Sequence, residues 1–202
     1  MSARDDILGA IRARPASAAV RPAAYDPPAN DGDAIERFSQ LATRAAAEVR
    51  VLDSEADIPG AVAEILRARN LPAEIHLPPG AALGDLEWQR ASGLTLKTSP
   101  PGPDDAAVTR APFGIAETGT LAYPSAKAEP ASWHFRPGLE IAVLKAGDIL
   151  PHMETVLARV KAKGMPATLN FVTGPSRTGD IEQTLELGAH GPKVLAILIV
   201  RA

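Results

Sequence analysis

The sequence has 202 residues and a formal net charge of −3. Hydrophobic residues make up 46% of it, which is enough for a folded core and excludes a disordered chain. The charge balance shows neither the basic footprint of a nucleic-acid-binding protein nor a polybasic patch for membrane surfaces. No cysteine is present, so these residues cannot form a disulfide, supply a catalytic thiol, or ligate an iron–sulfur cluster or structural zinc through sulfur.

Hydropathy and the histidine pattern exclude two further classes. The longest wholly apolar run, residues 194–200, is far too short to cross a bilayer, and no apolar signal core follows the polar residues 1–6. We therefore expect no membrane span and a cytoplasmic protein. The histidines show no HExxH-like pairing, so we expect no metal site; one could only be assembled from distant parts of the chain. These histidines are His76, which we expect to be structural, and His134, His152 and His190.

In chain order, the first predicted element is a short amphipathic helix over residues 2–12. Residues 15–32 are rich in proline and alanine and predict an extended linker. We therefore divide the chain into an extension, residues 1–32, and one domain, residues 33–202.

The remaining pattern alternates between the two types of element. Helices are predicted over residues 33–49, 58–70 and 148–163, and strands over 51–52, 73–77, 94–97, 106–109, 121–123, 139–144, 167–172 and 193–200. The last strand is apolar on both faces, which is typical of a central position in a helix-covered sheet. This alternation predicts an α/β three-layer sandwich, in which ligands collect at the carboxyl ends of strands.

The stretch 171–184 is the first candidate for a binding site. It predicts a strand end, a tight loop containing Gly174, Ser176, Arg177 and Thr178, and a helix that begins at Asp180 and ends before Gly188. Backbone N–H groups at a helix N-terminus beside an arginine suit a small anionic ligand. The alternative is a well-capped connection with a solvated arginine.

A second turn, Glu117-Thr118-Gly119-Thr120, also follows a predicted strand, so we expect both glycine-bearing loops to meet at one crevice. There Glu117 and Arg177 would face the same anion. A partly desolvated Glu117 could serve as a general base or as a nucleophile toward an acyl group; alternatively it caps backbone N–H groups. His190, between small residues in the turn before the last strand, is a further catalytic candidate.

Three segments carry a family resemblance. They are Ile115-Ala116-Glu117-Thr118-Gly119-Thr120-Leu121, residues 174–185 (Gly-Pro-Ser-Arg-Thr-Gly-Asp-Ile-Glu-Gln-Thr-Leu) and Leu187-Gly188-Ala189-His190-Gly191-Pro192. Together they resemble the lactate-utilisation protein C family (LutC/YkgG), whose module is the LUD domain. The resemblance spans roughly residues 33–201, and the short N-terminal helix is also typical.

The resemblance implies a Rossmann-like sandwich similar to the NagB/RpiA/CoA-transferase-like superfamily. It also implies a role in oxidising L-lactate to pyruvate beside companion subunits that carry iron–sulfur clusters, so that this chain binds no cofactor. Two positions depart from the family pattern: Glu140 stands where a histidine is common, and Gly179 where alanine is common. The family supplies no established catalytic residue to carry over.

Three hypotheses follow. The first is a non-redox subunit of a lactate-oxidising system that binds a small anionic ligand, partner subunits, or both; no GxGxxG fingerprint for flavin or nicotinamide is present. The second is a stand-alone CoA-transferase-like or sugar-phosphate-isomerase-like enzyme that uses Glu117. The third is an assembly factor that docks through the N-terminal helix and the aromatic segment 133–135.

Overall fold

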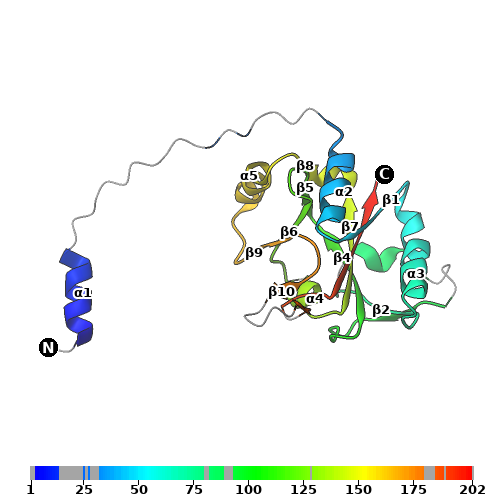
Figure 1. Cartoon of the computed structure of the whole chain (residues 1–202), viewed down its shortest axis with the longest axis horizontal. Coiled ribbons are helices and arrows are strands. Elements are labelled where there is room, and N and C mark those ends of the chain that lie inside the picture. Colours follow the sequence, from blue (N-terminus) through cyan, green and yellow to red (C-terminus); the bar gives the residue numbers. More distant parts are fainter. Residues whose placement is uncertain are drawn as a thin grey trace.

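The computed structural model describes residues 3–13, 25, 27, 32–79, 82–88, 93–127, 129–179, 185–188 and 190–201. Its centre is a six-stranded, fully parallel sheet (Figure 1). The strand order is β1 (Glu48–Leu52), β12 (Val194–Val200), β7 (Leu139–Lys145), β4 (Ala106–Ala111), β2 (Glu74–His76) and β3 (Thr95–Lys97). The apolar strand at the end of the chain therefore does lie inside the sheet, between β1 and β7.

A second, four-stranded sheet packs on one side of the first. Its order is β8 (Ile149–Leu150), β5 (Phe113–Ile115), β6 (Thr120–Pro124) and β9 (Leu169–Val172). Strands β5 and β8 continue from the carboxyl ends of β4 and β7, and β6 pairs antiparallel with both β5 and β9. The helices are α1 (Ala3–Ala13), α2 (Ala34–Arg44), α3 (Ile58–Ala68), α4 (Ser132–Phe135) and α5 (Met153–Lys163), with short 3-10 turns η1 (Glu55–Asp57), η2 (Ala82–Asp85) and η4 (Ala146–Asp148).

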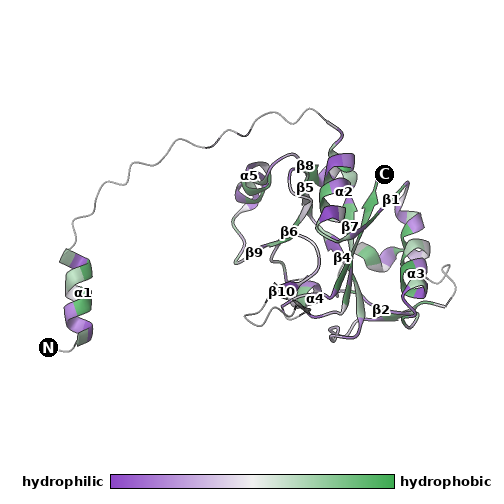
Figure 2. Ribbon diagram, in the orientation of Figure 1, coloured by the Kyte–Doolittle hydropathy of each residue, from purple (hydrophilic) through white to green (hydrophobic). Residues whose placement is uncertain are grey.

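The core is divided by the two sheets. Helix α3 covers one face of the central sheet, where Ile65, Ile141 and Leu198 belong to one apolar cluster. Helix α2 and the second sheet cover the other face, and α5 closes the outer side of the second sheet. The strongly hydrophobic central strands stand out in Figure 2. The expected α/β sandwich is confirmed, with the second sheet as an addition.

Several predicted helices differ from the structure. The helix predicted over residues 33–49 ends at Arg44, because residues from Glu48 onward form β1. Helix α5 begins at Met153 instead of residue 148, because Ile149 and Leu150 pair with β5 and form β8. The helix predicted from Asp180 to Leu187 is absent from the described part of that stretch. There β10 (Arg177–Gly179) and β11 (Leu185–Leu187) form an antiparallel pair, and residues 180–184 lie outside the described residues.

Helix α1 contributes nothing to this core, because all its residues are exposed, including Ile7 and Ile11. The division of the chain at residue 32 stays a prediction. Among the described helices, none combines the length and apolar character needed to cross a bilayer.

Candidate functional site

Four of the predicted site residues line one cavity. It has a volume of 280 Å³ and lies between residues 171–177, residues 190–192 and Phe135. Gly174, Ser176, Arg177 and His190 belong to its lining, and we call it the Arg177 cavity. The predicted loop at residues 174–177 thus shares a cavity with the His190 turn, whereas no residue of the second predicted loop, 117–120, lines it.

Ser176 holds these two loops together. Its backbone N–H donates to the carbonyl of Pro192 at 2.9 Å, and its own carbonyl accepts from the N–H of Gly188 at 3.1 Å. Its hydroxyl oxygen accepts from the N–H of His190 at 3.3 Å. A side chain at Gly191 would start 3.3 Å from the Cβ of Ser176, so the glycine keeps the contact close. The hydroxyl hydrogen of Ser176 is not used in these bonds and can be donated to a ligand.

The charge at this cavity is positive. Arg177 and His190 are both exposed, so a guanidinium and an imidazole can reach a ligand from opposite loops. A guanidinium can bind a carboxylate through two parallel hydrogen bonds. The described residues do not show the expected helix N-terminus directly after the loop, because that segment begins as β10. Asp180 lies outside the described residues, and of Thr178 only the backbone position in β10 is described.

The predicted loop at residues 117–120 lies next to the loop that contains Gly174. Leu121 pairs with Val172 across β6 and β9, and the hydroxyl oxygens of Thr120 and Thr173 are 2.7 Å apart. Gly119 and Gly174 both have positive φ, 66° and 72°. A Cβ at Gly119 would stand 2.2 Å from the backbone N of Ala42, and one at Gly174 2.0 Å from the carbonyl oxygen of Ala45. The backbones of both turns therefore pack closely against the backbone at the end of α2.

Glu117 does not point to the Arg177 cavity and is not among its lining residues. One oxygen of Glu117 is 2.8 Å from Nδ1 of His152, and the other accepts from the backbone N–H of Met153 at 2.9 Å. Partial burial raises the pKa of Glu117, but these hydrogen bonds and the charges of His152 and Arg37 outweigh it and lower the pKa. The expectation that Glu117 and Arg177 face one ligand is therefore wrong, since the carboxylate caps the first turn of α5. Thr118 is exposed in the same turn.

Sequence reasoning missed a buried polar cluster behind Phe135. Oε1 of Glu140 accepts three hydrogen bonds, from Thr109 at 2.8 Å, His134 Nδ1 at 2.9 Å and the Tyr123 hydroxyl at 3.1 Å. Glu140 is fully buried, and its Oε2 has no hydrogen-bond partner among the described residues. Burial and the nearby Glu140 raise the pKa of Tyr123 well above its ordinary value, so its hydroxyl stays a donor. The sequence did contain one sign of this cluster, because Glu140 stands where the resembled family commonly has a histidine.

The aromatic segment 133–135, a docking surface in the third hypothesis, is mostly buried. Trp133 and His134 are buried, and the His134 ring lies against Tyr123 with centroids 3.9 Å apart. Only Phe135 reaches the Arg177 cavity.

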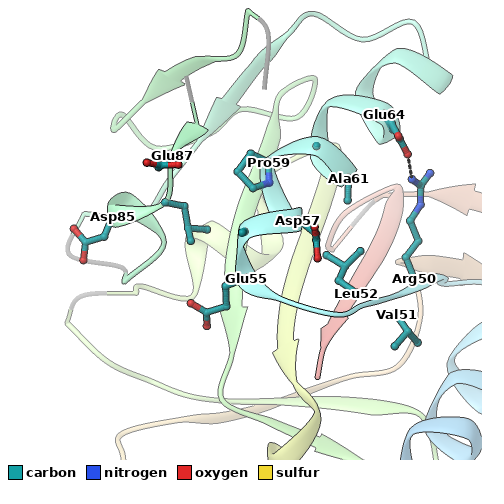
Figure 3. A pocket seen from close by; sticks show the side chains of 13 residues that line it. Arg50, Val51, Leu52, Glu55, Asp57, Pro59, Ala61, Glu64, Asp85 and Glu87 are labelled. Atoms are coloured by element: carbon teal, nitrogen blue, oxygen red, sulfur yellow. Dashed lines mark hydrogen bonds and ion pairs between the residues drawn. The ribbon is translucent and has the colours of Figure 1, made fainter. Parts of the chain in front are cut away.

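A larger hollow lies elsewhere, at the carboxyl end of β1 and beside α3 (Figure 3). It measures 780 Å³ and is lined by five acidic residues, Glu55, Asp57, Glu64, Asp85 and Glu87. The guanidinium of its one lining arginine, Arg50, already pairs with Glu48 and Glu64. Ligands of parallel sheets usually bind at the carboxyl ends of the strands, where this hollow lies. Its negative charge, however, disfavours an anionic ligand.

Comparison with known proteins finds similar sequences over part of the chain. A family model described as the LUD domain matches residues 104–200. The chain is 34% identical to "Lactate utilization protein C" of Bacillus licheniformis over 125 residues, 59% of this chain and 48% of that protein. It is 33% identical to the protein of that name in Bacillus subtilis, over 46% of this chain and 41% of that protein. The matches thus span about half, or less, of the length of these relatives.

A solved structure shares the fold. It is described as a crystal structure of a DUF162 family protein from Deinococcus radiodurans, and the superposition has a TM-score of 0.63. The match covers 86% of this chain and 99% of that chain at 23% sequence identity. The expected resemblance and the expected fold are both confirmed.

Proposed function

We propose, from the match of a LUD-domain family model to residues 104–200, that this chain is a cytoplasmic, non-redox subunit of an iron–sulfur system that oxidises L-lactate to pyruvate. In this role it binds a small carboxylate in the Arg177 cavity. The observation that carries the proposal is the meeting of Ser176, Arg177 and His190 on one hollow. The names of the relatives supply the process.

The non-redox assignment follows from the residues present. Without cysteine, these 202 residues cannot ligate an iron–sulfur cluster in the usual way, and they contain no GxGxxG fingerprint. Electron transfer from lactate therefore belongs to companion subunits that carry the clusters. No cofactor is assigned to this chain.

A small carboxylate fits the chemistry of the cavity. Arg177 supplies a fixed positive charge with two parallel donors, and the hydroxyl of Ser176 supplies a further donor. His190 can donate to, or accept from, a hydroxyl or keto oxygen next to the carboxylate, according to its protonation state. Lactate and pyruvate both combine a carboxylate with such an oxygen.

The alternative, a stand-alone enzyme with Glu117 as base or nucleophile, is less well supported. A general base works best when its pKa lies near the working pH, whereas the contacts of Glu117 lower its pKa. Both its oxygens are already engaged, by His152 and by the N–H of Met153.

Growth on L-lactate tests the proposed role. A strain that lacks this gene would be complemented with the wild type, with Arg177→Ala, or with Arg159→Ala, an exposed arginine on α5 that serves as a matched control. We expect the Arg159 variant to restore growth and the Arg177 variant to fail while accumulating to the same level. Equal growth of both variants would count against the Arg177 cavity.

The purified chain tests the division of labour. Incubated alone with L-lactate and an artificial electron acceptor, it should reduce none of the acceptor. Turnover in this assay would overturn the non-redox assignment, whatever the growth experiment shows.

A further inference from the structure

Three side chains with metal-ligating atoms gather on the side of the central sheet where β2 meets β4. They are Glu74, His76 and Asp105, and each offers one ligand atom within 4.8 Å of the other two. Neither the Arg177 cavity nor the acidic hollow includes all three. Acidic side chains often lie close together without binding a metal ion. Whether a metal ion binds here therefore depends on the hydrogen bonding and burial of His76.

The topology brings these residues together. Side chains alternate along a strand, so Glu74 and His76 share one face of β2, while Ile75 between them points into the core cluster of α3. Strand β4 runs parallel to β2 with Ala107 opposite His76. Asp105, which directly precedes β4, is thereby placed beside the imidazole.

His76 presents an unused, buried nitrogen. Only 3% of the residue is exposed, and Nδ1 lies 2.7 Å from the backbone carbonyl oxygen of Ser99. Because a carbonyl only accepts, Nδ1 carries the hydrogen, and the Nε2 of the neutral ring then holds a free lone pair. Nε2 has no hydrogen-bond partner among the described residues. A histidine whose other nitrogen donates to a backbone carbonyl is the usual form of a metal ligand.

Asp105 faces this lone pair. Its Oδ2 is 3.4 Å from Nε2 of His76 and also accepts from the N–H of Gly102 at 2.7 Å, which fixes the carboxylate. Two ligands of a tetrahedral ion, each about 2.1 Å from it, are about 3.4 Å apart. A lone pair aimed at a carboxylate oxygen is unfavourable unless a proton or a cation lies between them. A 20 Å³ cavity lined in part by Glu74 and Asp105 adjoins the cluster.

We propose that Glu74, His76 and Asp105 bind a divalent transition-metal ion. One imidazole nitrogen with two carboxylate oxygens suits Zn²⁺ or Mn²⁺ better than Mg²⁺, which prefers oxygen ligands alone, or Cu⁺, which prefers sulfur. Three protein ligands leave at least one coordination position for water or another small molecule.

A lysine competes for one of the ligands. The Nζ of Lys97 forms an ion pair with Oε1 of Glu74. A metal ion would therefore have to displace this ammonium group or share the carboxylate with it. Removal of Lys97 should therefore increase the affinity for the metal ion, so the proposal predicts a gain of binding as well as losses.

Calorimetric titration of the full chain with Zn²⁺, after dialysis against a chelator, tests the proposal. We expect one ion per chain, weakened at least about tenfold by Asp105→Asn or Glu74→Gln. The matched control is Asp104→Asn, which changes the neighbouring, almost fully exposed carboxylate and should leave the affinity unchanged. Lys97→Met should increase the affinity about fivefold, as expected for removal of one nearby positive charge.

Spectroscopy separates this site from non-specific binding. With Co²⁺ in place of Zn²⁺, the wild type should show the visible absorption of a four- or five-coordinate ion, and Asp105→Asn should lose it. Circular dichroism of each variant checks that the fold is intact. Absence of stoichiometric binding, or equal weakening by the Asp104 and Asp105 variants, would overturn the proposal and leave His76 and Asp105 as an ion pair.

Discussion

At the scale of single residues, Glu140 is the most informative side chain. The family resemblance places a histidine here, whereas this chain has a buried carboxylate whose one oxygen accepts from Thr109, Tyr123 and His134. Its role is to gather donors that would otherwise be unpaired in the core beside the Arg177 cavity.

Replacement of Glu140 by alanine should therefore cost about 3–5 kcal/mol of unfolding free energy, because three buried donors lose their acceptor at once. Glu140→Gln should cost less, since the amide oxygen can still accept. Chemical denaturation of both variants measures the difference. A loss below about 1 kcal/mol for the alanine variant would show that the cluster contributes little to stability.

Glu117 leads to a prediction about pH. Its pKa is lower in the folded chain than its ordinary value of 4.5, so the carboxylate stabilises the fold above that value, and the contribution is lost as the pH falls through the lower, folded pKa. Glu117→Gln should lower the stability by about 1 kcal/mol at pH 7, the usual effect of a helix cap, and the difference from wild type should shrink below pH 4.5.

Thermal denaturation at pH 7 and at acidic pH measures this effect. A difference that grows on acidification would contradict the capping role. If the glutamine variant were as stable as wild type but failed to support growth on L-lactate, the catalytic alternative would regain support.

At the scale of elements, the turns at Gly119 and Gly174 fix the second sheet to α2. Both have positive φ, and a Cβ at either would overlap the backbone of residues 41–45. Gly119→Ala and Gly174→Ala should each destabilise the chain by about 3 kcal/mol or more, through backbone strain and overpacking together.

Gly147, in η4, is the control for these two glycines. A Cβ at this position meets nothing within 4 Å, so Gly147→Ala should change the stability little. The denaturant midpoints of the three variants measure these differences in stability. Equal midpoints for Gly119→Ala and Gly147→Ala would be incompatible with close packing of the turn on α2.

The elements also show where sequence reasoning succeeds and fails. Elements with a strong local signal are predicted correctly, such as α3 with its periodic apolar face and β12 with its continuous apolar run. The sequence predicts a loop where β10 lies and a helix where β11 lies, because Asp180 resembles a helix cap, whereas the pairing of β10 with β11 joins residues several positions apart. Pro151 was the missed signal at α5, since it marks the boundary between β8 and the helix.

At the scale of the whole molecule, the alternation of elements was sufficient to predict the sandwich, but not which loops would share a cavity. Both glycine-bearing loops belong to the second sheet, whose register places Thr120 beside Thr173 and turns Glu117 toward His152. No local pattern encodes that register. The carboxyl end of the central sheet instead holds the acidic hollow, so the predicted anion site lies where the parallel-sheet rule did not place it.

The central claim is that the Arg177 cavity binds a small carboxylate, and calorimetric titration of the purified chain with L-lactate or pyruvate tests it most directly. We expect one ligand per chain, an affinity reduced at least about tenfold in Arg177→Ala, where a charge-assisted bidentate contact is lost, and no change in Arg159→Ala. Inorganic phosphate serves as the competing anion. Absence of binding by either carboxylate, or binding that Arg177→Ala leaves intact, would contradict the account.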